Sequence, residues 1–149
     1  MTDSDLERFV SRLAQAAAGT FWEELGCELE HIEPGRTVIV LEAGARHLNG
    51  IGMLHGGVHA SLLDQAMGIT AMAARPDDKV VTSHLNIHYL FPLAPGKVTV
   101  SAELIHQTRR MLTVSGKVED CQGRIGSWGS GSFRVLADDA PKDGKGPQV

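Results

Sequence analysis

The sequence predicts an α+β fold in which an antiparallel sheet wraps around one long central helix, with an extra amphipathic helix at the N-terminus. Three observations support this fold class. Residues 58–74 have helix-forming composition and few polar side chains, strand-like segments follow them, and short turns separate those segments. Because a helix that is apolar on most sides must be buried, and short connections favour antiparallel pairing, the sheet is expected to curl around the helix.

The N-terminal segment, residues 3 to about 18, is expected to form the amphipathic helix. Its apolar side chains recur at helical spacing, and Ser4 and Glu7 have the spacing of a capping box. Residues 36–43 contain a β-branched run after a Pro-Gly turn, which predicts a strand. The apolar face of the N-terminal helix consists of Leu6, Phe9, Val10, Leu13 and Ala17.

The middle of the chain begins with a glycine-rich loop, residues 49–57, directly before the long helix. Arg75-Pro76 ends this helix, because a residue that precedes proline disfavours helical dihedral angles. One domain is expected over residues 1–136, and residues 137–149, which are almost without apolar side chains, are expected to be disordered. The four strands that follow the helix are predicted at residues 79–91, 97–107, 111–120 and 124–136.

Composition and charge exclude several classes of partner. The chain has 149 residues, 42% hydrophobic content and a formal net charge of −4, so it has no overall positive field to attract nucleic acid or an anionic membrane. No apolar run approaches the roughly 20 residues of a membrane span, and the acidic start lacks the basic region of a signal peptide. We expect a cytoplasmic protein in which Cys27 and Cys121 form neither a disulfide nor a thiolate metal site.

Asp64 is the most informative single residue. A carboxylate in a mostly apolar helix must be paired, protonated or retained for function. The preceding glycines let the backbone approach a ligand closely, and the N-terminus of the helix offers free N–H groups, so Gly57 is the natural donor to an oxyanion. The alternatives are a solvent-facing acid at the helix edge and a tight Gly56-Gly57 turn without a ligand.

The spacing of Gly57 and Asp64 leads to a prediction about assembly. Seven residues at about 100° each return to nearly the same helix face, but the rise over them is roughly 10 Å. A base and an oxyanion donor must both lie within about 3 to 4 Å of one reacting carbonyl and its water. If both serve one carbonyl, Asp64 must come from a second chain, as in a two-fold homodimer with shared sites.

Four other patterns do not match the sites that they resemble. His55 and His59 have the spacing of two zinc ligands, but the glutamate of the zinc-protease motif is absent; His84 and His88 share a strand face, but no third ligand is evident. The glycines before His55 do not fit a dinucleotide fingerprint, and those around Ser127 do not fit the serine-hydrolase pattern. No metal site is therefore predicted.

A longer motif resembles a known family. The stretch from Asn49 to Gly68 reads NGIGMLHGGVHASLLDQAMG and resembles phenylacetate-pathway-type (PaaI-like) hotdog-fold acyl-CoA thioesterases, of the 4-hydroxybenzoyl-CoA thioesterase superfamily. It combines an Asn, a His-Gly-Gly turn and a helical Asp in the family's order, and residues 81–89 resemble the strand that follows. The layout agrees from Phe21 to about Leu136.

The resemblance implies a hotdog fold, a homodimer that often assembles into a homotetramer, and hydrolysis of acyl-CoA, with aromatic acyl groups such as phenylacetyl or hydroxyphenylacetyl mildly favoured. Carried over by position, Asp64 is general base or nucleophile and the Gly57 N–H polarises the thioester carbonyl. The remaining residues implied in catalysis or substrate binding are Asn49, which helps place water or the carbonyl, His55, which shapes the turn, Thr82, which orients water, Gly56 and Ser83.

Chemistry and alternatives complete the hypothesis. A thioester leaves as a thiolate, so a carboxylate, an oriented water and N–H donors suffice without metal or redox cofactor. Arg109-Arg110, with Lys117 or Arg124, provides a local basic patch for the phosphates of CoA, although an Arg-Arg hairpin tip is commonly only solvated. Two other functions stay open: a hotdog hydratase or dehydratase of 3-hydroxyacyl thioesters with His55 as base, and a non-catalytic acyl-CoA-binding protein.

Overall fold

The computed structural model describes residues 1–137, and its main feature is a six-stranded antiparallel sheet in the order β1-β2-β4-β5-β6-β3. Consecutive strands pair with each other except β3, which pairs with β6 at the far edge. The strands are β1 (Glu28–Glu33), β2 (Arg36–Ala43), β3 (Val80–Tyr89), β4 (Gly96–Gln107), β5 (Met111–Asp120) and β6 (Ile125–Val135). The predicted α+β class with an antiparallel sheet is confirmed.

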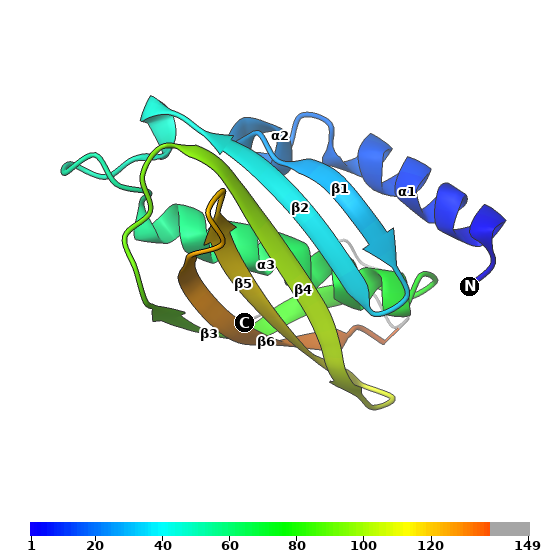
Figure 1. Ribbon diagram of the computed structural model, residues 1–149. Helices are drawn as coiled ribbons and strands as arrows, with labels where there is room; N and C mark the ends of the chain where they lie inside the picture. The colour runs from blue at the N-terminus through cyan, green and yellow to red at the C-terminus, as the bar shows by residue number, and fades with distance from the viewer. Residues whose placement is uncertain (138–149) are drawn as a thin grey trace, which may run out of the picture.

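The long helix α3 (Gly56–Ala74) lies across one face of the curved sheet (Figure 1). Its packing against β5 is close at Gly116, where a Cβ atom would lie 3.2 Å from Leu63 and 3.3 Å from Met67. Leu62, Leu63, Ala66 and Met67 are fully buried, as their apolar character predicts. One stripe of α3, which includes Asp64 and Gly68, is only half-buried, so the sheet leaves that side accessible.

Strand β3 forms an open edge of the sheet, and most of its side chains are exposed. Its pairing with β6 contains an irregularity between Thr82 and His84, which is a β-bulge. Because of this extra residue, Thr82 meets α3 while Leu85 and Ile87 also pack on the core. The bulge therefore determines which side chains of β3 reach the central helix.

The N-terminal part contains α1 (Asp3–Ala17), the short helix α2 (Phe21–Leu25) and a 3-10 turn (Ala45–His47). Figure 1 shows α1 next to β1, at the opposite side of the sheet from β3. The predicted capping pair Ser4 and Glu7 is wrong: Thr2 is the N-cap, and its side chain and Asp5 bond each other's backbone N–H groups. The helix begins at Asp3, two residues earlier than a Ser4 cap would place it.

The other element bounds follow the predictions closely, except that the long helix begins earlier than expected and two elements were not predicted. The strand predicted at residues 36–43 is β2, and the helix predicted from residue 58 begins at Gly56, with His55 as its N-cap. The sequence did not predict β1 or α2, because β1 has six residues of which only two are apolar, and α2 has only five residues. Residues 138–149, expected to be disordered, lie outside the part of the chain that is described.

Candidate active site on the central helix

Asp64 lies on the half-buried stripe of α3 and is bonded to the edge strand. The Thr82 hydroxyl donates a hydrogen bond to Asp64 Oδ1, with an oxygen–oxygen distance of 2.7 Å. This bond fixes one carboxylate oxygen and leaves the other available to a ligand or water. Sequence analysis placed both residues in the site, and the structure brings them together.

The N-terminus of α3 is capped by His55. The Gly57 N–H donates to His55 Nδ1 at 2.8 Å, so the proposed oxyanion donor already has a partner in the free chain. A carbonyl oxygen that is to bind this N–H must displace the His55 ring, which is exposed. The lone pair of His55 Nδ1 is occupied by the Gly57 N–H, so this nitrogen is not free to act as the base of a hydratase in this arrangement.

Tyr89, at the end of β3, contacts the same turn and was missed by sequence analysis. Its hydroxyl donates to the Gly56 carbonyl oxygen at 2.7 Å. Its ring meets His59 edge-on, with centroids 5.5 Å apart and an interplanar angle of 79°. Tyr89 and Gly56 are 33 residues apart, and no local pattern in the sequence indicates that they meet.

His59 is buried and bonded to β6 rather than available as a metal ligand. Its Nδ1 lies 2.7 Å from the Ser127 hydroxyl oxygen, and burial lowers the pKa of the imidazole below its ordinary value. Of His84 and His88, the second stacks on Trp128 with centroids 5.8 Å apart. Within residues 1–137, no three His, Cys, Asp or Glu side chains form a group that could hold a metal ion.

Asn49 and Ser83 have structural partners in the free chain. Asn49 Oδ1 accepts hydrogen bonds from the Ile51 N–H at 3.1 Å and the Met53 N–H at 3.0 Å, which shapes the loop before α3. The Ser83 hydroxyl donates to the Ser132 carbonyl at 3.0 Å, next to the bulge in β3. Neither side chain contacts Asp64 or Gly57 through a hydrogen bond in the described structure.

Gly57 and Asp64 are both in α3, seven residues apart on the same face. At about 1.5 Å per residue their separation along the axis is roughly 10 Å, as expected for a continuous helix. One chain therefore does not bring both groups to one carbonyl. A cavity of about 350 Å³ lies at the Gly57 end and is lined by His55, Phe21 and Ser61 among others.

Four arginines gather at the other end of α3. A cavity of about 550 Å³ is lined by Arg75, Arg109, Arg110 and Arg134, with Asp78 as the single acid on its wall. Lys117 and Arg124, the expected companions of the Arg109-Arg110 pair, do not line this cavity: Lys117 pairs with Glu119 at 3.0 Å and Arg124 with Asp120 at 2.7 Å. Arg75 and Arg134 join the hairpin only through the tertiary fold, so spacing along the chain did not reveal them.

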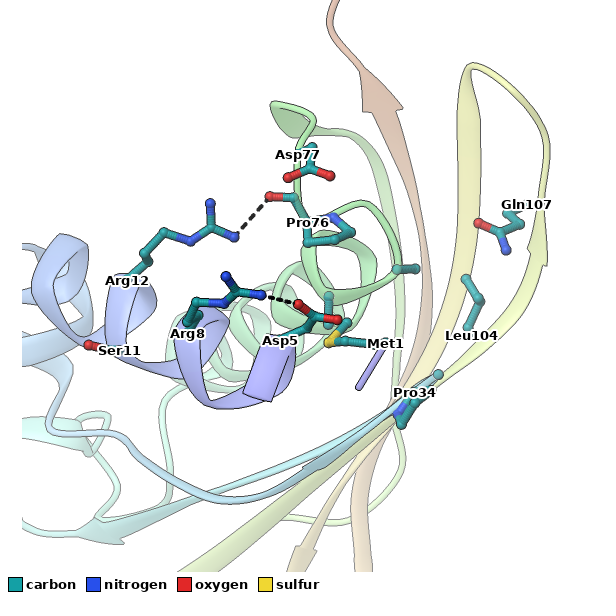
Figure 2. A pocket seen from close by; sticks show the side chains of 13 residues that line it. Met1, Asp5, Arg8, Ser11, Arg12, Pro34, Pro76, Asp77, Leu104 and Gln107 are labelled. Carbon is teal, nitrogen blue, oxygen red and sulfur yellow. Dashed lines mark hydrogen bonds and ion pairs between the residues drawn. The ribbon is translucent and has the colours of Figure 1, made fainter. Parts of the chain in front are cut away.

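Two further cavities lie under α1. One, of about 450 Å³, is mainly apolar and is lined by Leu13, Phe21, Gln65, Ile69 and Met72 among others, so it adjoins the residue that follows Asp64. The other, of about 900 Å³, lies between the start of α1, the β1–β2 turn and the end of α3. Figure 2 shows that its arginines are occupied, Arg8 by Asp5 and Arg12 by the Pro76 carbonyl. Asp64 does not line it, so we do not assign it to catalysis.

The remaining sequence expectations concern cysteines and membranes. Burial raises the pKa of the Cys27 thiol to about 12, and Cys121 is a free, exposed cysteine. A thiol with so high a pKa is a poor nucleophile at neutral pH. No helix of the described part of the chain is sufficiently long and apolar to cross a membrane.

Comparison with known proteins identifies the relatives of this arrangement. The sequence profile described as "Thioesterase superfamily" matches residues 51–127, half of the chain. The 1,4-dihydroxy-2-naphthoyl-CoA hydrolase of Listeria monocytogenes is 35% identical over 56% of this chain and 69% of its own. Human acyl-coenzyme A thioesterase 13 is 27% identical over 68% of this chain and 74% of its own. The E. coli PaaI protein from the phenylacetic acid degradation operon has the same fold, with a TM-score of 0.83, 20% identity, and coverage of 92% and 97%.

Proposed function

We propose that this chain, which belongs to the thioesterase superfamily and is a thioester hydrolase, cleaves acyl-CoA to the free acid and CoA with Asp64 as its catalytic carboxylate. The observation that carries the proposal is the 2.7 Å hydrogen bond from Thr82 to Asp64 on the half-buried stripe of α3. A carboxylate held in this way, beside apolar surface, is a suitable general base or nucleophile. The relatives named for CoA thioester hydrolysis support the substrate class.

The chemistry follows from the groups present. As a base, Asp64 takes a proton from water while the water oxygen attacks the thioester carbonyl; as a nucleophile, it attacks that carbon itself and water cleaves the resulting anhydride. In both routes the carbon–sulfur bond breaks and CoA leaves as a thiolate that then takes up a proton. The Gly57 N–H, released from His55, stabilises the developing oxyanion.

A homodimer with shared sites supplies both groups to one carbonyl. The open edge of β3 has unpaired backbone groups that can pair with a second copy. Thr82, which contacts Asp64, lies near the start of β3 and Tyr89, which contacts Gly56, lies at its end, so the point midway between them falls at Leu85 and Asn86. Antiparallel self-pairing about that point places Thr82 opposite Tyr89 of the partner subunit, and hence Asp64 near Gly57 of the partner subunit. Pairing of two such dimers gives the homotetramer that the resemblance implies.

The arginine cavity is our candidate for the phosphates of CoA. Arg109, Arg110 and Arg134 provide local positive charge in this acidic chain, together with Arg75, whose guanidinium is also bonded to the Thr108 carbonyl and paired with Asp78 at 3.5 Å. Arg75 lies on nearly the same face of α3 as Asp64, roughly 16 Å along the axis. The pantetheine arm, extended at about 3.5 Å per three bonds, covers roughly 15 Å.

The apolar cavity beside Gln65 is our candidate for the acyl group. Its volume of about 450 Å³ is within the usual range for small-molecule pockets, and its lining is mainly apolar. Such a pocket accepts an aromatic ring or a medium aliphatic chain. The dihydroxynaphthoyl group in the name of the Listeria relative supports an aromatic acyl group, such as phenylacetyl or hydroxyphenylacetyl, as the first candidate.

The proposal is tested by thiol release from aromatic and aliphatic acyl-CoAs, with wild type, Asp64→Asn and Asp77→Asn compared. Asparagine keeps the shape of Asp64 and removes the base, so we expect a loss of about 10²-fold or more. Asp77→Asn makes the same chemical change at an exposed position and should retain activity. Binding of acyl-CoA by both wild type and Asp64→Asn with no thiol release from either would refute catalysis and favour a binding protein.

A further inference from the structure

We propose that Tyr89 is a positioning residue for the oxyanion donor, because its hydroxyl holds and polarises the peptide group that joins Gly56 to Gly57. The inference rests on the proposed function, since it takes the Gly57 N–H as the group that stabilises the oxyanion. Tyr89 itself touches no reacting atom in this arrangement. It acts through the backbone of the first turn of α3.

The geometry connects two ends of one peptide group. Tyr89 donates to the Gly56 carbonyl oxygen at 2.7 Å, and the N–H of the same planar unit is that of Gly57. In a trans peptide the carbonyl and the N–H point in opposite directions. A hydroxyl that fixes the direction of the carbonyl therefore also fixes that of the N–H, which points at His55 Nδ1 beside the cavity of about 350 Å³.

Two adjacent glycines make such an anchor useful. Glycine restricts its backbone dihedral angles less than any other residue, so this peptide group rotates more easily than others in α3. In the free chain the His55 ring also holds the Gly57 N–H, at 2.8 Å. A substrate carbonyl takes the place of that ring, so the Tyr89 hydrogen bond is the side-chain contact that continues to fix the peptide during the reaction.

The same hydrogen bond also strengthens the donor. A bond accepted by a peptide carbonyl polarises the unit and makes its N–H a better donor, since hydrogen bonds in a chain reinforce one another. A stronger donor stabilises an oxyanion more than a neutral carbonyl, so the benefit appears in the transition state rather than in substrate binding. The contribution should therefore affect kcat more than KM.

Tyr89 is itself held in place by buried groups. The Tyr89 ring meets the buried His59 ring edge-on, and His59 Nδ1 lies 2.7 Å from the Ser127 hydroxyl oxygen. These contacts connect β3, α3 and β6. A Cβ atom at Gly56 would lie 3.5 Å from the tyrosine ring, an ordinary contact distance, so the ring rests directly on the turn. The hydroxyl therefore has a defined direction toward the carbonyl.

The test compares Tyr89→Phe with wild type, Asp64→Asn and Thr70→Val in thiol release from one acyl-CoA. Phenylalanine keeps the ring and removes the donor, and we expect kcat to fall about threefold to tenfold with KM within about twofold. Thr70→Val also removes a hydroxyl that donates to a backbone carbonyl of α3, that of Ala66, and should not change kcat. The amide resonance of Gly57 should move in Tyr89→Phe and stay in Thr70→Val.

A second measurement uses the fact that Tyr89 is the only tyrosine of the chain. Growth on 3-fluorotyrosine labels this position alone, and the fluorinated phenol is a stronger donor, so kcat measured below neutral pH should rise. A purely structural role would not respond to donor strength. The role of Tyr89 is overturned if kcat is unchanged in both Tyr89→Phe and the fluorotyrosine protein, or if only KM rises. If Asp64→Asn is still inactive in that experiment, the proposed function stays intact. If wild type releases no thiol from any acyl-CoA, the proposed function is refuted. Independently, an unchanged Gly57 amide resonance in Tyr89→Phe refutes polarisation of the Gly56–Gly57 peptide by Tyr89.

Discussion

Mixed dimers provide a quantitative test of the shared site. Asp64→Asn removes the carboxylate, and Gly57→Pro removes the N–H while keeping a dihedral angle that the first turn of a helix accepts. Gly56 lacks the Cβ that would clash with a following proline. If each site takes Asp64 from one subunit and Gly57 from the other, a dimer of the two variants has one intact site and one doubly altered site. Each variant alone should lose about 10²-fold or more.

The expected recovery follows from counting. Random exchange of equal amounts makes roughly half of the dimers mixed, each with one working site of two, so activity should return to about a quarter of the wild-type value. The assay is thiol release after the variants are unfolded and refolded together, and native mass spectrometry measures the mixed fraction. As a control, Asp64→Asn refolded with itself should not recover. If mixed dimers form but no activity returns, each site lies within a single chain and the proposed two-fold arrangement is wrong.

Two other predictions concern the arginine cavity and the buried histidine. Replacing Arg109 and Arg110 together by alanine should raise KM for acyl-CoA about tenfold, roughly 1.4 kcal/mol, with kcat nearly unchanged. On a thioester of pantetheine, which lacks the nucleotide, the variant and wild type should have the same KM. An equal loss on both substrates would contradict the assignment of the cavity to the CoA phosphates. His59 is held neutral by burial, so the unfolded chain binds a proton that the folded chain does not as the pH falls through 6.5, the ordinary pKa of the group. The folded state therefore has its full stability above that pH and loses part of it below. Urea denaturation measures the fall in unfolding free energy between about pH 8 and about pH 5, and this fall should be smaller in His59→Gln than in wild type. His106→Gln, which alters an exposed ring, should show the same fall as wild type.

The sequence predicted the elements whose patterns are local. The β-branched run of β2 follows a turn and marks a strand from Arg36 to Ala43, and Pro76 ends the predicted helix at the correct place. The carboxylate of Asp64 stood out because apolar neighbours surround it along the helix. In each case the physical cause lies within a few residues of the feature, so one sequence contains enough information.

Other parts of the site depend on contacts between distant segments. The hydrogen bond from Tyr89 to Gly56 joins residues 33 apart, and Arg134 meets Arg109 only because β5 and β6 pair. The bulge at Thr82 could not be read from alternation, since an extra residue reverses the faces that follow it. The His55 cap on Gly57 was also unforeseen, because Ser, Thr, Asp and Asn are the usual residues there.

The edge strand β3 unites these observations. Near its start, Thr82 bonds the Asp64 carboxylate, and at its end Tyr89 bonds the turn that contains the proposed oxyanion donor. Within one chain these two contacts serve groups roughly 10 Å apart on α3, too far for one carbonyl. Antiparallel pairing of two copies exchanges the ends of the strand, so the start of one β3 meets the end of the other. The same strand would then close the sheet edge, orient the base and orient the N–H, and the dimer would be a requirement of catalysis rather than an addition to it.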